Sequence, residues 1–235
     1  MSRDNILFAV VGLLTGLIVG FIFANSLNEK GAVTATTGDM QMNSNLPAGH
    51  PDIGAGGTQG GMQPGMLESI DRAKQAPDDF EAQLKAAEAY YQIERFDEAI
   101  GFLTTANKLR PDDREVIIHL GNVNFDASKY DEAQKWYLDA LAKKPDDVNV
   151  RTDLGLTYVF KEPADYDKAI VEFNKALELD PNHIQTLQNL TVAHTKKGDP
   201  ARARETLQKL ESVDPKNVAL PKLKTELDAL AATPK

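Results

Sequence analysis

The chain has 235 residues, enough for one or two domains, and 42% of them are hydrophobic. Acidic residues outnumber basic residues by 35 to 26, which argues against a nucleic-acid partner because phosphate binding needs clustered positive charge. Cysteine is absent, and this excludes a disulfide framework, a thiolate metal site and a thiol nucleophile.

The first 25 residues predict a membrane anchor. Residues 6–24 contain no charged side chain, and as a helix they would span about 28 Å, close to the ~30 Å hydrocarbon core of a bilayer. We therefore expect a short cytoplasmic tail at 1–5 and a single transmembrane helix at 6–25. A cleaved signal peptide is the alternative, although its apolar region usually has only about 7–15 residues.

Flanking charge and small residues add two expectations about this anchor. Arg3 and the α-amine give the N-terminal side a slight excess of positive charge, which favours a bacterial inner-membrane protein with its C-terminal domain in the periplasm. Small residues that recur every four positions would permit self-association or packing on another membrane protein, although glycine is also common in membrane helices. These residues are Gly12, Gly16, Gly20 and Ala24.

Residues 26–66 have the composition of a flexible linker, with nine glycines and no aromatic residue. Such a segment cannot bury enough apolar surface to offset its ordering entropy, and its r.m.s. reach is about 35 Å. Soft metal ligands gather here, namely His50 and four methionines, Met40, Met42, Met62 and Met66. Their spacing matches no defined copper or haem site, so we expect an inert tether, with no metal and no cofactor.

The remaining chain is organised by an internal repeat. Five prolines are separated by 34, 34, 36 and 34 residues, and a fixed period of this size is typical of stacked repeat units. The prolines are Pro77, Pro111, Pro145, Pro181 and Pro215. We expect a folded domain at 67–235, with a short first helix before Pro77. Repeats of two helices each follow at 80–113, 114–147, 148–183 and 184–217, and a capping helix at 218–231.

Small and large residues alternate at the expected contact between the two helices of a repeat. Gly121 and Gly155 would allow close approach beside Tyr137 and Phe173. Aspartates near the start of each second helix are expected to be N-caps. These are Asp97, Asp131, Asp167 and Asp199.

These motifs resemble tetratricopeptide repeats, which are helix–turn–helix units of 34 residues. The resemblance covers residues 78–217 and is carried by Leu120-Gly121 with Asn124, by Leu154-Gly155 with Tyr158, and by Tyr130-Asp131-Glu132-Ala133 with Tyr137, Ala140 and Pro145. It implies an all-α solenoid whose concave groove binds peptides or protein segments. The chain departs from the pattern at the glycine position, which is Ala87 in the first repeat and Thr191 in the fourth, and in two extra residues of the third repeat.

The resemblance also implies that the first helix of each repeat lines the groove. The peptide-binding candidates are Tyr91, Ile118, His119, Asn122, Phe125, Leu156, Val159, Phe160, Asn189 and Val192. Further candidates on the same helices are Glu81, Leu84, Lys85, Glu88, Glu115, Asn149, Thr152, Asp153, Gln185, Gln188 and Thr195. Some tetratricopeptide domains clamp a carboxylate with Lys and Arg, but Glu81, His119 and Asp153 at these positions argue against that use. The apolar candidates favour an amphipathic helix or an extended apolar segment as ligand. The alternative is that several of them pack against the neighbouring repeat.

No motif of catalysis is present. The four histidines do not form a metal-ligand pattern, and there is no nucleophile elbow or phosphate loop. We expect a protein that is not an enzyme, a membrane-anchored scaffold that binds a protein or peptide partner. Two alternatives stay open: an assembly factor of cytochrome c maturation that holds apocytochrome, and a self-assembling structural protein that forms a homo-oligomer.

Overall fold

The computed structural model describes residues 64–232, which are helical with short connections. Within this range the chain divides into two compact units, residues 64–181 and residues 182–232. The expected membrane helix at 6–25 and its small residues Gly12, Gly16, Gly20 and Ala24 lie outside the described residues. Among residues 64–232, no helix combines the length and the apolarity that crossing a bilayer requires.

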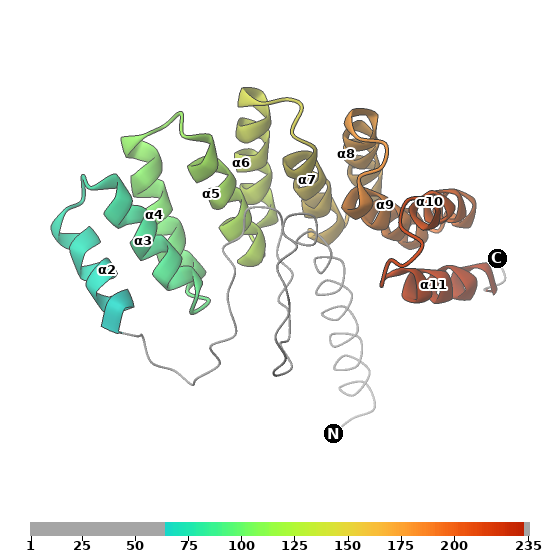
Figure 1. Cartoon of the computed structure of the whole chain (residues 1–235), viewed down its shortest axis with the longest axis horizontal. Coiled ribbons are helices and arrows are strands. Elements are labelled where there is room, and N and C mark those ends of the chain that lie inside the picture. Colours follow the sequence, from blue (N-terminus) through green and yellow to red (C-terminus); the bar gives the residue numbers. More distant parts are fainter. Residues whose placement is uncertain (1–63, 233–235) are drawn as a thin grey trace, which may run out of the picture. The chain divides into compact units, whose positions relative to one another are not determined.

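The first unit is a stack of three helical hairpins preceded by a single helix (Figure 1). Its helices are α2 (Pro64–Gln75), α3 (Phe80–Tyr91), α4 (Phe96–Leu109), α5 (Arg114–Asp126), α6 (Tyr130–Lys143), α7 (Val148–Phe160) and α8 (Tyr166–Leu179). The hairpins are α3–α4, α5–α6 and α7–α8, and α2, α4 and α6 each contact the helix that follows. The helix before Pro77 begins at Pro64, three residues earlier than expected, so the last residues assigned to the linker are helical.

The second unit contains one hairpin and one further helix. The hairpin consists of α9 (Ile184–Lys197) and α10 (Pro200–Val213), and α11 (Leu220–Ala232) packs on both of its helices. Leu220, Leu223 and Leu227 of α11 are buried, as expected for a capping helix. This helix begins two residues later than expected, because residues 218–219 form part of the turn before it.

The recurring Pro-Asp-Asp sequences explain where three of the first helices begin. In each case the proline ends the preceding helix, and the second aspartate is the N-cap of the next helix. The caps are Asp79, Asp113 and Asp147. The Asp147 side chain accepts a hydrogen bond from the Val150 amide at 3.0 Å and also pairs with Arg114 of the preceding hairpin.

The expected caps of the second helices are partly wrong. Asp97 and Asp131 lie inside the first turns of α4 and α6, whose N-cap residues Arg95 and Lys129 form no side-chain cap. Asp131 instead accepts a hydrogen bond from Lys161 at 2.7 Å, and Asp97 accepts one from Lys129, so both link neighbouring hairpins.

The other two second helices are capped by side chains. Asp165, two residues before the expected Asp167, caps α8 through the Lys168 amide at 3.0 Å. The expected cap Asp199 is confirmed, because its side chain accepts from the Arg202 amide at 3.1 Å.

The two helices of each hairpin contact each other through a small residue on one helix and a larger side chain on the other. A Cβ atom added to Gly121 would lie under 3.0 Å from the ring of Tyr137, and one added to Gly155 equally close to Phe173. Both rings are fully buried. In the first and last hairpins the glycine is replaced by Ala87 and Thr191, and the aromatic position by leucine, at Leu103 and Leu207. The departures from the repeat pattern are therefore matched in pairs, with a larger residue on one helix and a smaller one on the other.

First and second helices differ in how much of their surface is covered. The first helices bury seven to nine residues each, for example nine in α5. The second helices bury only three or four, and the first of these is in each case a fully buried alanine in the first turn. The first helices are thus the elements whose side chains contact neighbours on several sides.

Candidate functional site

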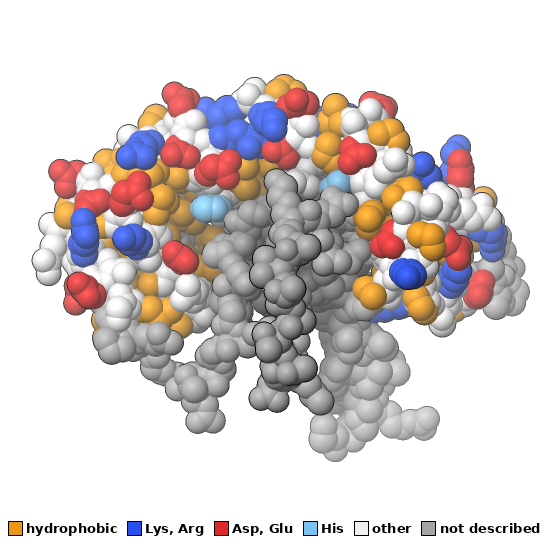
Figure 2. All heavy atoms as spheres, viewed as in Figure 1, with side chains coloured by type: hydrophobic (Ala, Val, Ile, Leu, Met, Phe, Trp, Pro, Cys, Tyr) orange, Lys and Arg blue, Asp and Glu red, His pale blue; other side chains and the backbone are white. Residues whose placement is uncertain are grey.

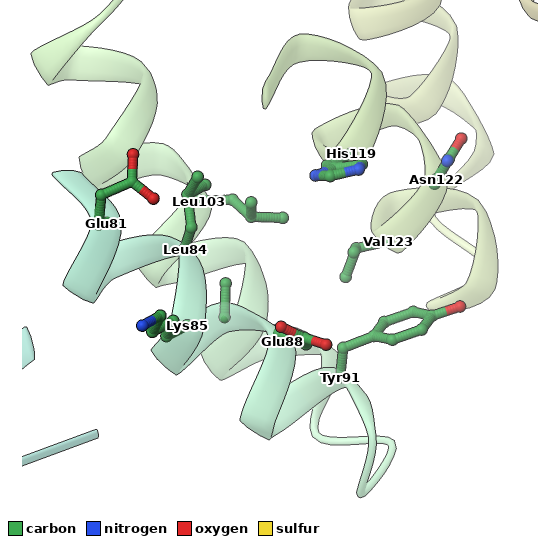
Figure 3. Close-up of a pocket in the computed structure, with 10 residues that line it drawn as sticks. Glu81, Leu84, Lys85, Glu88, Tyr91, Leu103, His119, Asn122 and Val123 are labelled. Carbon is green, nitrogen blue, oxygen red and sulfur yellow. The ribbon is translucent and has the colours of Figure 1, made fainter. Parts of the chain in front are cut away.

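A pocket of about 490 Å³ lies in the first unit, between α3 and α5 (Figure 3). Its apolar walls are formed by Leu84, Ala87, Tyr91, Leu103 and Val123. Leu103 comes from α4, and the other four lie on the two helices that face each other across the pocket. The space is large enough for one or two side chains of a peptide, and a mostly apolar wall with few polar groups is typical of a ligand site.

Polar and charged groups complete the lining. Glu81, Lys85 and Glu88 are exposed along α3, and His119 and Asn122 lie on α5. Figure 3 shows His119 and Val123 directed toward α3, whereas the amine of Lys85 points away from α5. The pocket therefore presents two carboxyl groups and one amine along α3, opposite an imidazole and an amide on α5.

Two buried tyrosines connect the pocket to a polar cluster behind it. The Tyr91 hydroxyl donates to Asp126 Oδ2 at 2.6 Å, which ties α3 to the end of α5. The Tyr137 hydroxyl of α6 donates to Asn122 Oδ1 at 2.9 Å. This hydrogen bond fixes the Asn122 amide, whose Nδ2 is buried and has no hydrogen-bond partner.

Two carboxyl groups in this cluster have raised pKa values. Burial raises the pKa of Asp126 to about 7, against a smaller opposing effect of the hydrogen bond from Tyr91. Burial also raises the pKa of Asp153 on α7 well above its ordinary value, and the charges of Asp147 and Asp126 add to the effect. Burial and the nearby carboxylates raise the pKa of Tyr91 and of Tyr137. Burial thus disfavours the ionised forms of both carboxyl groups.

Three of the ten groove candidates line this pocket, namely Tyr91, His119 and Asn122. Others serve packing between hairpins. The Phe125 and Phe160 rings meet edge to face at 5.7 Å, and Tyr130 contacts both, at 5.4 and 6.2 Å. Ile118 and Leu156 are buried, and Val159 is half-buried.

The remaining two candidates, Asn189 and Val192, are buried on α9 of the second unit. Asn189 has no hydrogen-bond partner at either side-chain atom.

Sequence reasoning missed three lining residues. Ala87, Leu103 and Val123 were assigned to packing or left out, yet each also borders the pocket. The sequence did contain a signal for this space. In the first hairpin, the small Ala87 and Leu103 occupy the positions where the next two hairpins have a glycine and a large ring, Tyr137 or Phe173, so less of the space is filled.

Charge is mixed over the surface of residues 64–181. Figure 2 shows acidic and basic side chains interspersed on the face that it presents, and many of them form ion pairs, such as Lys143 with Asp112 at 2.7 Å.

Within residues 64–232, no three histidine or acidic side chains are grouped closely enough to hold a metal ion.

Comparison with known proteins relates two segments of the chain to a repeat family. The tetratricopeptide repeat family matches residues 67–117 and 162–227. No curated protein matches the chain. Among solved structures, a crystal structure of MamA is 24% identical with a TM-score of 0.58 and covers 64% of this chain and 87% of its own. MamA 41-end from Desulfovibrio magneticus RS-1 is 21% identical with a TM-score of 0.55, over 67% and 99% of the two chains.

YrrB, described as a tetratricopeptide repeat protein with an unusual peptide-binding site, is 20% identical with a TM-score of 0.56, over 68% of this chain and 88% of its own. At these identities the likeness concerns the fold.

Proposed function

We propose that this chain, whose hairpins are tetratricopeptide repeats, is a protein-binding scaffold that holds a peptide segment of a partner in the pocket between α3 and α5. The binding step involves no chemical reaction. A membrane anchor at residues 6–25 would keep the scaffold at the bacterial inner membrane, with the repeats on the periplasmic side.

The pocket is the observation that carries this proposal. It joins an apolar wall, which can accept a side chain, to the buried Asn122 amide, whose Nδ2 is free to donate a hydrogen bond. A peptide backbone carbonyl is the acceptor that would satisfy such a donor. YrrB, a tetratricopeptide repeat protein with a peptide-binding site, supports the same use of this fold.

A random-peptide library displayed on phage tests the proposal. We expect the full-length chain in detergent micelles to enrich a common motif, and Leu84→Glu to weaken binding of the resulting synthetic peptide at least about tenfold, because a charge would enter the apolar wall. Leu138→Glu is the matched control, since Leu138 on α6 is 51% exposed and lies outside the pocket lining. Equal affinity of the Leu84→Glu variant and the wild type would place binding elsewhere.

The anchor has a separate test. We expect the full chain to sediment with membranes and to resist extraction by carbonate, and a chain that lacks residues 1–25 to remain in the supernatant. Recovery of both chains in the supernatant would contradict membrane anchoring and leave peptide binding unaffected.

A further inference from the structure

We propose that Tyr137 is a positioning residue that decides which ligand group the pocket between α3 and α5 accepts. It binds the oxygen of the Asn122 amide and leaves the Nδ2 donor for a ligand, so the pocket selects a partner segment that presents a main-chain carbonyl beside an apolar side chain. This inference rests on the proposed function and names the part of the peptide that the scaffold would recognise.

The Tyr137 hydroxyl is held in place by packing. The Tyr137 side chain of α6 is fully buried, and a Cβ added to Gly121 would lie 2.5 Å from its ring. The same close approach of the two helices brings the hydroxyl to the next residue of α5, where it donates to Asn122 Oδ1 at 2.9 Å. Burial raises the pKa of Tyr137 well above its ordinary value, so the hydroxyl keeps the proton that it donates. Asn122 is therefore bound through its oxygen by a group that has little freedom to move.

Asn122 and Tyr137 form a pair that only the second of the four hairpins contains. At the equivalent positions of the third and fourth hairpins, the residue on the first helix is apolar and its partner on the second helix lacks a hydroxyl. These pairs are Leu156 with Phe173 and Val192 with Leu207. In the first hairpin Leu103 also lacks a hydroxyl, and its partner Glu88 is exposed. A buried amide at this position thus occurs together with the hydroxyl that orients it.

The Nδ2 atom of Asn122 indicates a ligand that supplies an acceptor. Asn122 is 2% exposed and lines the pocket, and its Nδ2 has no hydrogen-bond partner. Buried polar groups in proteins are nearly always hydrogen-bonded, so an unpartnered donor in the wall of a pocket calls for an explanation. Because Tyr137 already binds Oδ1, the ligand group that pairs with this amide has to be an acceptor. A main-chain carbonyl is the acceptor that every residue of a peptide carries.

The walls of the pocket suit the side chain of the same residue. Leu84, Leu103 and Val123 supply an apolar surface, and the volume of about 490 Å³ holds one or two side chains. The Asn122 donor requires no main-chain N–H from the ligand. Proline, which is apolar and has a carbonyl but no N–H, therefore fits as well as leucine or valine.

Peptides with a modified main chain test the inference. The probe is the synthetic peptide selected from the library, with one residue at a time changed to a thioamide, whose sulfur is a weaker acceptor, or to an N-methyl amide, which has no N–H. We expect one residue at which the thioamide lowers affinity for the wild-type chain about threefold to tenfold, whereas N-methylation there changes affinity less than about twofold.

Tyr137→Phe separates positioning from packing. The variant keeps the ring, as Phe173 does in the third hairpin, and removes only the hydroxyl. We expect it to bind the unmodified peptide and to lose most of the thioamide effect, because the freed Asn122 amide can turn and accept from a peptide N–H instead. Tyr166→Phe, on α8 and outside the pocket lining, is the matched control and should keep the full effect.

The results that would overturn the inference leave the proposed function standing. They are a bound peptide without a thioamide-sensitive residue, a residue at which N-methylation is the more harmful change, or an undiminished thioamide effect in Tyr137→Phe. Failure of the wild-type chain to enrich any motif would overturn the proposed function and this inference with it.

Thermal melting checks that Tyr137→Phe folds. If it does not, the double variant Asn122→Leu with Tyr137→Phe decides the question, because it reproduces the pair that the third hairpin contains, Leu156 with Phe173. We expect the double variant to show no thioamide effect, and a persistent effect would mean that this pair does not read the ligand carbonyl.

Discussion

Gly155 shows how little space separates the two helices of a hairpin. A Cβ added at Gly155 would lie under 3.0 Å from the ring of Phe173. The ring cannot easily move aside because it is fully buried. We expect Gly155→Ala to lower the free energy of unfolding by ~1–3 kcal/mol, the usual cost of overpacking a core. Urea unfolding followed by circular dichroism measures the change.

Gly101 is the matched control for this substitution. It lies inside α4, and an added Cβ would meet no atom within 4 Å. Gly101→Ala should therefore raise stability by up to about 1 kcal/mol, because alanine is the better helix former. If both alanines lowered stability equally, close approach at Gly155 would not be the cause.

Asp126 gives the first unit a pH-dependent stability. Its pKa is raised from 3.8 to about 7 in the folded protein, so between about pH 4 and pH 7 the folded state holds a proton that the unfolded state releases. The free energy of unfolding contributed by this group therefore falls as pH rises through that range, by up to about 4 kcal/mol.

Asp126→Asn tests this dependence. The amide can still accept the hydrogen bond from Tyr91 but does not ionise. We expect the variant to lose less stability than the wild type between pH 4.5 and about pH 7.5 in urea unfolding. Parallel curves for the two proteins would show that Asp126 ionises normally when folded.

At the scale of the helix, Asp147 both caps α7 and pairs with Arg114. Asp147→Ala removes the acceptor for the Val150 amide, so we expect a loss of about 1–2 kcal/mol. The neighbouring Asp146 is exposed, and Asp146→Ala should change stability by less than about 0.5 kcal/mol. Thermal unfolding of the two variants compares them, and similar melting temperatures would rule out a dominant role for the cap.

The sequence predicted the helices well because two strong signals agreed, a fixed proline period and the acidic residues that follow three of these prolines, Pro77, Pro111 and Pro145. It failed at the starts of α4 and α6 for a physical reason. An acidic residue is favourable both as an N-cap and within the first helical turn, so Asp97 and Asp131 satisfy either assignment. Only the backbone distinguishes them, through the positive φ of Glu94 and Ser128 in the turns before these helices.

The site could be predicted only in part. Tyr91, His119 and Asn122 line the pocket, as their positions on the first helices suggested. Phe125 and Phe160 contact each other across two hairpins instead. An apolar residue on a helix that is covered on several sides fits a groove and a packing interface equally well, so sequence alone cannot separate the two roles.

At the scale of the whole molecule, each unit has one helix that is not part of a hairpin, α2 in the first and α11 in the second. Leu220, Leu223 and Leu227 of α11 are buried, and each buried leucine contributes about 1.5–3 kcal/mol. We expect a chain that ends at residue 217 to lose the cooperative unfolding of its second unit and to scatter light on warming. A chain that ends at residue 232 is the control, and identical melting of the two chains would mean that α11 adds no stability.

The paired volumes inside the hairpins also limit how this chain could be recombined. Position 121 has no room for a side chain because the large Tyr137 ring packs directly against its backbone. At the equivalent position of the first hairpin, Ala87 faces the smaller side chain of Leu103. A chimera that transplants α6 onto α3 would force the Tyr137 ring against the Ala87 methyl group, and the reverse graft would leave a void beside Gly121. The two helices of a hairpin would therefore have to be exchanged together for the contact between them to be kept.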